Sequence, residues 1–152
     1  MSNDLSQQKS LPPTSPVVID RIRQVEALSL QRPQVDIETS HLIHDGIYTR
    51  TICVPAGVMI TGALIKIPTT LTVSGECVVL IGEGDSIEIK GFAVIPASSG
   101  RKQVFIAISD THISMSFKTD ARNIKDAEAE FTDETEILKS NTNKNNITIT
   151  ED

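Results

Sequence analysis

Apolar positions in the first part of the chain repeat with the period of a helix. Ser15-Pro16 supplies an N-cap followed by a proline suited to the first helical position, and Pro33 ends the segment. Between these limits, four apolar residues fall at spacings of four, three and three, which places them on one side of a helix: Val18, Ile22, Val25 and Leu28. The pattern predicts an amphipathic helix over about residues 15–31.

The apolar stripe of this helix needs a surface to cover it, because a short isolated helix is only marginally stable in water. The stripe can pack on the rest of its own chain, or it can dock on a neighbouring chain. The sequence leaves both alternatives open. We therefore treat Val18, Ile22, Val25 and Leu28 as candidate partner-docking residues.

Between residues 38 and 119 the apolar period changes to that of β-strands. Ile87 and Ile89 alternate with polar residues, as expected where one face of a strand is buried. Residues 47–54 and 58–67 are predicted as strands on either side of a Pro-Ala-Gly turn. Further turn signals separate the later runs: Ser74-Gly75, Gly82-Glu83-Gly84-Asp85 and Pro96-Ala97-Ser98-Ser99-Gly100. About eight short strands follow one another, which predicts an all-β sandwich or barrel.

The last part of the chain is acidic and then polar. A cap near Asp120 or Asn123 predicts a short helix, and we interpret the acidic residues of 126–136 as its solvated face. Residues 140–152 form an Asn/Thr tract of low complexity and are expected to be flexible. Alternatively, residues 146–150 add a strand to the sheet edge of a neighbouring chain.

These patterns divide the chain into three parts. Residues 1–37 form an N-terminal arm that starts with a polar, flexible stretch and contains the helix. Residues 38–119 form the β-barrel, and residues 120–152 form the acidic helix and the polar tail.

Composition narrows the class of partner. Hydrophobic residues make up 39% of the 152 residues but aromatic residues only 3%, so the core must consist of aliphatic side chains. A net charge of −6 argues against nucleic acid, which requires clustered Lys and Arg, although a few local cations can still hold a small anion. Cys53 and Cys77 lie in apolar runs and are predicted to be free buried thiols. The polar N-terminus and the lack of a long apolar run predict a soluble cytoplasmic protein without membrane contact.

Two runs of sequence resemble a known family. These runs, His41-Leu42-Ile43-His44-Asp45-Gly46-Ile47-Tyr48-Thr49-Arg50 and Val54-Pro55-Ala56-Gly57-Val58-Met59-Ile60-Thr61-Gly62, are similar to motifs of small cupin-like proteins of tailed bacteriophages. Shorter runs resemble further motifs of the same family: Ser74-Gly75-Glu76, Ile95-Pro96, Gly100-Arg101-Lys102 and Ser109-Asp110-Thr111. The resemblance covers about residues 20–135 and implies a small cupin-like β-barrel, or jelly roll, with the N-terminal helix and flexible termini attached to it.

The chain departs from metal-binding cupins where a metal would lie. Cupin sites combine a His-x-His pair with a glutamate and a further histidine. After Gly62 this chain instead has Leu64, Ile65, Lys66 and Thr69 or Thr70. Only Glu76 and His112 remain as ligands of the required types, and two ligands do not form a site. We therefore expect no metal and no other cofactor.

The other candidate groups give weaker signals. His41 and His44 are three residues apart in what we expect to be a loop leading into the barrel, and they lack a third ligand. His112 is expected to be a turn residue at the start of a strand. We interpret Arg101-Lys102 as a solvated hairpin tip, with contact to a phosphate as the alternative.

Two functions follow as hypotheses. The first is a non-enzymatic phage structural protein, a barrel that oligomerises and decorates or connects virion components through its terminal arms. It would form a homo-oligomer with other phage structural proteins as partners, first in the host cytoplasm and then in the virion. The second is a soluble phage protein that sequesters a small anionic host ligand, such as a nucleotide signal. Its binding residues would be Lys66, Glu76, Arg101 and His112 at the barrel mouth.

Overall fold

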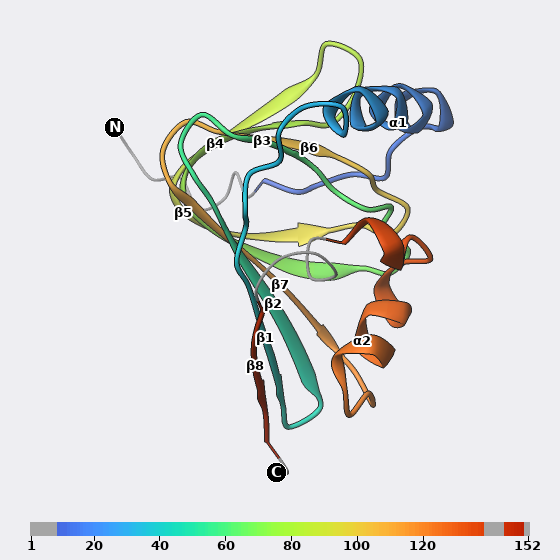
Figure 1. Cartoon of the computed structure of the whole chain (residues 1–152), viewed down its shortest axis with the longest axis vertical. Coiled ribbons are helices and arrows are strands. Elements are labelled where there is room, and N and C mark those ends of the chain that lie inside the picture. The colour runs from blue at the N-terminus through green and yellow to red at the C-terminus, as the bar shows by residue number, and fades with distance from the viewer. Residues whose placement is uncertain (1–8, 139–144, 151–152) are drawn as a thin grey trace.

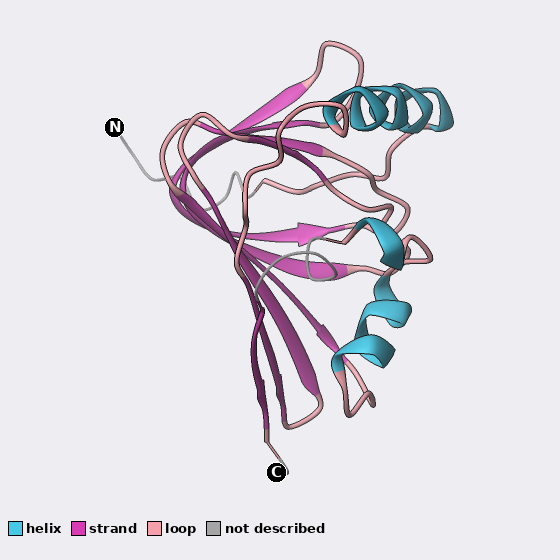
Figure 2. Ribbon diagram, in the orientation of Figure 1, coloured by secondary structure: helices cyan, strands magenta, loops and turns pink. Residues whose placement is uncertain are grey.

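The computed structural model describes residues 9–138 and 145–150, and the expectations for residues 1–8, 139–144 and 151–152 lie outside this part of the chain. Strands predominate in it, with two α-helices and one short 3-10 helix (Figure 2). In chain order the elements are α1 (Pro16–Ser29), β1 (Thr39–His44), β2 (Ile47–Val54), β3 (Met59–Thr61), β4 (Thr69–Leu80), β5 (Ser86–Ala97), β6 (Val104–Ala107), β7 (Thr111–Lys118), α2 (Ile124–Phe131), η1 (Thr135–Ile137) and β8 (Asn145–Ile149).

The strands form one strongly curved sheet. Its hydrogen-bonded order is β3-β6-β4-β7-β2-β1-β8, and β5 pairs with β4 outside this path. Figure 1 shows the sheet curling into an open half-barrel, with both α-helices on its open side. This arrangement confirms the predicted fold class as a mostly β, curled half-barrel with an N-terminal helix.

The bend of β4 lets one strand serve both halves of the curved sheet. Its residues Thr70–Ser74 pair with β7 and Cys77–Leu80 pair with β6, while β5 follows it along its whole length. Gly75, between the two segments, has φ +137°, and a Cβ there would lie 2.8 Å from Thr111 Cα. Only glycine fits this position. The predicted turn at Ser74-Gly75 is therefore wrong, because the glycine bends a continuous strand instead of ending it.

Two other strand boundaries also differ from the sequence-based prediction. In the predicted strand 58–67 only Met59–Thr61 forms a strand, and Ile65 makes an isolated bridge to Arg101. β5 continues through Pro96 to Ala97, where a loop was expected. Pro96 is compatible with a strand because β5 pairs on one side with β4 and a proline is tolerated at a sheet edge.

The hydrophobic core lies on the inner face of the sheet and is covered by α2. Tyr48, Phe117 and Phe131 pack together there, with ring centroids 5.3, 6.0 and 6.3 Å apart. These rings are three of the five aromatic residues of the chain. The remaining core is aliphatic, as the composition predicted, and Cys77 is a free buried thiol while Cys53 is a free, half-buried one.

Helix α2 begins where the sequence predicted a cap. The Asn123 side chain accepts a hydrogen bond from the backbone N–H of Asp126. The helix buries Ala127, Phe131 and also Glu128. The interpretation of this segment as a solvated acidic face is therefore wrong for Glu128, which is paired in the interior as described below.

Part of the apolar stripe of helix α1 packs on its own chain, and docking of the remainder on a neighbouring chain stays a prediction. The helix starts at Pro16 with Ser15 as N-cap, as predicted. Of the apolar stripe, Ile22 is buried and Val18 is half-buried, but Val25 and Leu28 are exposed. Only part of the stripe is therefore used in docking within the chain.

The two ends of the described chain are attached to the sheet. Leu11 is fully buried and forms a bridge to Ala97, although the polar N-terminal stretch was expected to be flexible. Strand β8 lies parallel to β1 of the same chain. The strand predicted for residues 146–150 therefore adds to the sheet of its own chain. The expectation of a flexible tail is wrong for this strand.

Candidate functional site: a cavity inside the barrel

A cavity of about 1020 Å³ lies on the inner side of the curved sheet. One of its walls is a strap, defined here as residues 30–38, which runs from the end of α1 across the sheet to β1 (Figure 1). The sheet supplies mostly apolar side chains, among them Ile52, Leu71, Phe105, Ile113 and Met115. A volume of this size is enough for a small organic ligand.

Arg101 is the most unusual residue of the cavity wall. Its side chain is buried, with the residue only 3% exposed. The guanidinium donates to Ser98 O at 2.9 Å and Thr69 Oγ1 at 2.8 Å, and lies 3.7 Å from Met115 Sδ. None of the ion pairs in the described part of the chain includes Arg101. Its positive charge is thus buried without a carboxylate.

The burial of the Arg101 guanidinium changes its pKa. Burial lowers this pKa to about 10, because desolvation penalises the charged form. The group remains protonated at neutral pH. A guanidinium has five N–H donors, and the contacts above leave the Nε–H and one Nη1–H free to donate to a ligand.

Gln103 supplies a second free donor on the same wall. The residue is 4% exposed, and its Nε2 is buried without a hydrogen-bond partner among the described residues. Both Gln103 and Arg101 line the cavity. A buried amide N–H without an acceptor destabilises the fold, so an oxygen of a ligand that accepts this hydrogen bond is favoured here.

A second arginine in the cavity is fully compensated. Arg50 Nη1 lies 3.0 Å from Glu128 Oε2, and their side chains are only 10% and 8% exposed. The Arg50 guanidinium also stacks over the Phe131 ring, 5.7 Å from its centroid. Arg50 is paired with Met115 in the sheet, and Arg101 Nη2 lies 3.7 Å from Met115 Sδ, so Met115 neighbours both the compensated and the uncompensated arginine.

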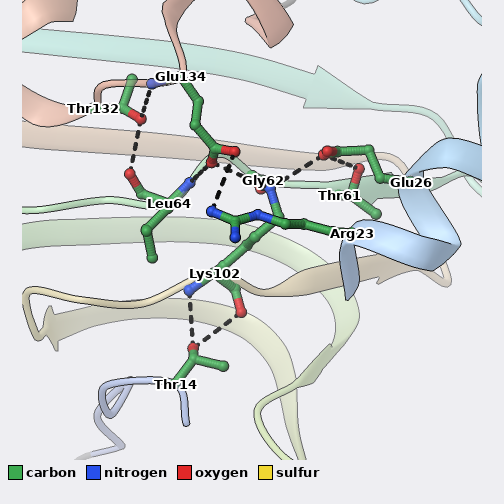
Figure 3. A network of polar contacts seen from close by, with 9 residues as sticks. All are labelled: Thr14, Arg23, Glu26, Thr61, Gly62, Leu64, Lys102, Thr132 and Glu134. Atoms are coloured by element: carbon green, nitrogen blue, oxygen red, sulfur yellow. Dashed lines mark hydrogen bonds and ion pairs between the residues drawn. The ribbon is translucent and has the colours of Figure 1, made fainter. Parts of the chain in front are cut away.

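Lys102, between Arg101 and Gln103 in sequence, joins the helix α1 to the barrel (Figure 3). Its fully buried Nζ contacts Gly62 O at 2.9 Å, Glu26 Oε2 at 3.2 Å and Glu134 Oε1 at 3.4 Å. Glu26 belongs to α1 and Glu134 follows α2, so one ammonium group connects both. We call this set of contacts the Lys102 clasp. Arg23 of α1 adds a contact to Glu134 at 3.7 Å.

The solvated hairpin tip predicted for Arg101-Lys102 is therefore wrong. Both residues are buried, and they point in different directions: Arg101 lines the cavity, whereas Lys102 Nζ contacts Glu26 and Glu134. The segment is extended next to Ile65 and Gly62, which explains why alternate side chains have opposite surroundings.

The other predicted ligand-binding residues do not line the cavity with Arg101. The Lys66 ammonium lies 2.7 Å from Asp133 at the surface. Glu76 is half-buried in β4, next to the bend, and His112 is exposed on β7. The sheet register places His112 opposite Ser74 and Cys53, three residues from Met115 along β7 and on the opposite face of the strand. The four residues are thus not one group.

The histidines are also not where the sequence suggested. His41 and His44 lie on strand β1, not in a loop; His41 contacts β8, and His44 contacts Thr150 directly after it. His41 Nδ1 accepts from the Tyr48 hydroxyl at 2.8 Å, and its Nε2–H donates to Asn145 Oδ1 at 2.9 Å. Burial lowers the pKa of His41, which favours the neutral ring that this arrangement uses.

The donor set of the cavity does not fit the metal of a metal-binding cupin. Its lining includes no histidine or cysteine. Of its acidic members, Glu26 is bound to Lys102 and Thr61, and Asp36 and Glu136 are exposed. Within residues 9–138 and 145–150, no group of three His, Cys, Asp or Glu side chains comes close enough to hold an ion. A guanidinium repels cations, and an amide N–H group does not bind them, whereas both groups donate hydrogen bonds to anions.

Sequence analysis found Arg101 but missed Gln103, Arg50 and Glu128. A signal for Gln103 was present, because Arg101 and Gln103 alternate with Lys102 as in a strand. The Arg50–Glu128 pair joins residues 78 positions apart, and no local sequence pattern predicts a contact over such a separation.

Comparisons with known proteins concern the fold and leave the ligand open. No family model matches the chain, and no curated protein matches it in sequence. A salicylate 1,2-dioxygenase from Pseudoaminobacter salicylatoxidans is similar in structure over 84% of this chain and 42% of that chain, with 14% identity and a TM-score of 0.47. A cupin-2 domain protein from Shewanella frigidimarina is similar over 62% of this chain and 91% of that chain, with 13% identity and a TM-score of 0.39. This chain thus covers less than half of the dioxygenase chain.

No helix within the described ranges is long and apolar enough to cross a membrane.

Proposed function

We propose that this protein binds a small organic anion in the cavity of its barrel. The observation that carries the proposal is the guanidinium of Arg101, which is buried in the cavity wall without a carboxylate partner. A buried charge that lacks a counter-charge is strongly unfavourable. An anion that enters the cavity supplies the missing charge and receives short, charge-assisted hydrogen bonds.

Arg50 supports this proposal as an internal comparison. It lies in the same cavity, and its charge is matched by Glu128 at 3.0 Å. Of these two arginines of the cavity wall, Arg50 has a carboxylate partner, and Arg101 has none among the described residues. The proposal is for binding and includes no chemical step.

A thermal-shift assay with a library of small organic anions tests the proposal. We expect at least one anion to raise the melting temperature of the wild type, because a ligand that binds only the folded state stabilises it. The Arg101→Met variant should not respond to that anion. Arg21→Met is the matched control, because Arg21 is an exposed surface residue paired with Glu83 and is not part of the cavity lining.

The proposal fails if no anion in the library stabilises the wild type, or if Arg101→Met responds as strongly as the wild type. Because a buried arginine is replaced, the folding of this variant must be verified by circular dichroism. Arg101→Lys provides a second variant, which keeps the charge but loses the planar donor fork. It should respond more weakly than the wild type.

A role in assembly remains a second candidate, and one observation favours it. Val25, Leu28 and Leu30 are exposed at the end of α1, with Leu28 at 63% and Leu30 at 64%. This unburied part of the helix is available to another chain. Phage origin, the virion as location and homo-oligomer formation stay predictions. If mass spectrometry does not detect the protein in purified virions, the phage-assembly role is contradicted.

A further inference from the structure

The charges around the cavity limit the charge of its ligand. Arg50 is matched by Glu128. The Lys102 ammonium is matched by Glu26, which also lines the cavity, and by Glu134, which Arg23 contacts as well. Three further charged residues of the lining are exposed, so water screens them: Arg32, Asp36 and Glu136. Arg101 is left as a single uncompensated positive charge, which one negative charge neutralises.

The hydrogen-bond donors of the wall describe the headgroup of the ligand. Arg101 has free N–H groups on Nε and Nη1, and Gln103 has an unpartnered Nε2 two residues along the same extended segment. All of these groups donate, so the headgroup must accept several hydrogen bonds. A carboxylate has this acceptor capacity and matches the geometry of a guanidinium.

The rest of the lining describes the body of the ligand. Aliphatic and aromatic side chains of the sheet dominate the wall beyond Arg101, from Ile52 and Leu71 to Phe105 and Ile113. These residues favour an apolar group, because its transfer from water to such a surface is favourable. A nucleotide would instead bring a second negative charge and a polar sugar into this surface.

Resting on the proposed function, we infer that the ligand is a monocarboxylate with an apolar body. Its carboxylate binds the free donors of Arg101, and Gln103 Nε2 donates to an oxygen of the same headgroup. Its apolar part lies along the inner face of the sheet, with the strap on the opposite side.

Isothermal titration calorimetry with matched ligands tests the inference. The probes are octanoate and naphthoate, the primary amide of each, and adenosine monophosphate as a dianion with a polar sugar. We expect each carboxylate to bind at least about tenfold more tightly than its amide, since a charge-assisted hydrogen bond contributes that much. Arg101→Met should abolish this preference, and Gln103→Leu should weaken carboxylate binding about fivefold or more. Arg21→Met should behave as the wild type.

A second readout locates the contact. In NMR spectra, octanoate should shift the Nε–H signal of Arg101 and the side-chain amide signals of Gln103, whereas octanamide should leave the Arg101 signal unchanged. This measurement uses the wild-type chain and does not depend on the folding of any variant.

The possible results separate this inference from the proposed function. If adenosine monophosphate binds in an Arg101-dependent manner and neither carboxylate does, the ligand class is wrong but the anion site stands. If the thermal-shift library and these probes all fail to bind, or bind equally well to Arg101→Met, both the site and the ligand class are wrong. Equal binding of carboxylate and amide to the wild type also overturns the inference.

Discussion

Residues that follow one another in the chain have opposite roles in this protein. Arg101 and Gln103 line the cavity, and Lys102 between them anchors the helix α1. Each of the three residues is at most 4% exposed, but among the described contacts only Lys102 has carboxylate partners. The local alternation of an extended segment determines which side chain points which way, and the partners on either side determine what each one does.

Gly75 offers a test of the bend in β4. We expect Gly75→Ala to lower the free energy of unfolding by about 2–4 kcal/mol, because the positive φ is strained and the new Cβ would collide with the backbone at Thr111. Urea denaturation measures the effect. Gly84→Ala is the matched control, since Gly84 also has a positive φ but has open space around it. It should cost about 1 kcal/mol. Equal losses would show that the close contact at the bend is unimportant.

The elements at the two ends of the chain are attached to the barrel by buried polar groups. Helix α1 is held by the Lys102 clasp together with the burial of Ile22, and β8 is held by its ladder with β1 and by His41. Much of the apolar surface of these elements remains exposed, for instance Leu28 and Ile147. Their attachment therefore depends strongly on specific polar contacts, which single substitutions can remove.

Loss of the Lys102 ammonium should release α1. We expect Lys102→Met to destabilise the protein by about 2–4 kcal/mol, because Glu26 loses its cation and Glu134 keeps only Arg23, while both carboxylates remain largely buried. Amide hydrogen exchange should accelerate first in α1. Lys66→Met is the control, because Lys66 and Asp133 are exposed and such pairs contribute less than about 1 kcal/mol. A Lys102→Met protein with protected α1 amides would contradict the role of the clasp.

The attachment of β8 should weaken in acid. The pKa of His41 is lowered from 6.5 by burial, with Arg50 acting in the same direction and Asn145 and Glu128 against it. The unfolded state therefore binds more protons below pH 6.5, and the stability contributed by neutral His41 is lost as pH falls from 6.5 toward the folded-state pKa. Hydrogen exchange of the β1–β8 ladder, compared between pH 7.5 and pH 5.5, should show faster opening in acid.

His41→Gln removes the titrating group from this ladder. Its opening should vary less with pH than in the wild type, over the range below the ordinary histidine pKa of 6.5. His112→Gln is the control, because His112 is exposed on β7 and is not part of the β1–β8 ladder. It should leave the pH dependence as it is. An unchanged pH dependence in His41→Gln would assign the effect to other groups.

At the scale of the whole molecule, the cavity and the exposed end of α1 are suited to different kinds of partner. The cavity faces inward and suits a small ligand, whereas the free part of α1 faces outward and suits another chain. The two are physically connected, because the strap that covers the cavity begins where α1 ends.

The predicted homo-oligomer can be tested at this surface. If the chain associates through the exposed end of α1, Leu28→Glu should shift the protein to a smaller species in size-exclusion chromatography with light scattering. The reason is that a charge cannot be buried in an apolar interface without a partner. Asp20→Leu, a substitution on the same helix at another exposed position, should not reduce the size of the species. An oligomer that is unaffected by Leu28→Glu would place the interface elsewhere.

The sequence alone determined the classes of element and the fold. The helical spacing of Val18 and Ile22, the N-caps Ser15 and Asn123, and the alternation in β5 and β7 are local patterns, and local patterns report local structure. The fold class followed from the number and spacing of the strands. Strand ends were less accurate, because Gly75 is equally suited to a turn and to a bend in a strand.

Only the tertiary structure decided which charges are compensated. Arg50 and Arg101 are the same residue type, and nothing in their neighbouring residues shows that Glu128 pairs with Arg50 while no described carboxylate pairs with Arg101. Burial and charge pairing depend on distances between residues that are remote in the chain, so they appear only when the sheet curls and α2 covers it. For that reason the barrel could be predicted from the sequence, whereas the uncompensated charge of Arg101 appeared only in the folded structure.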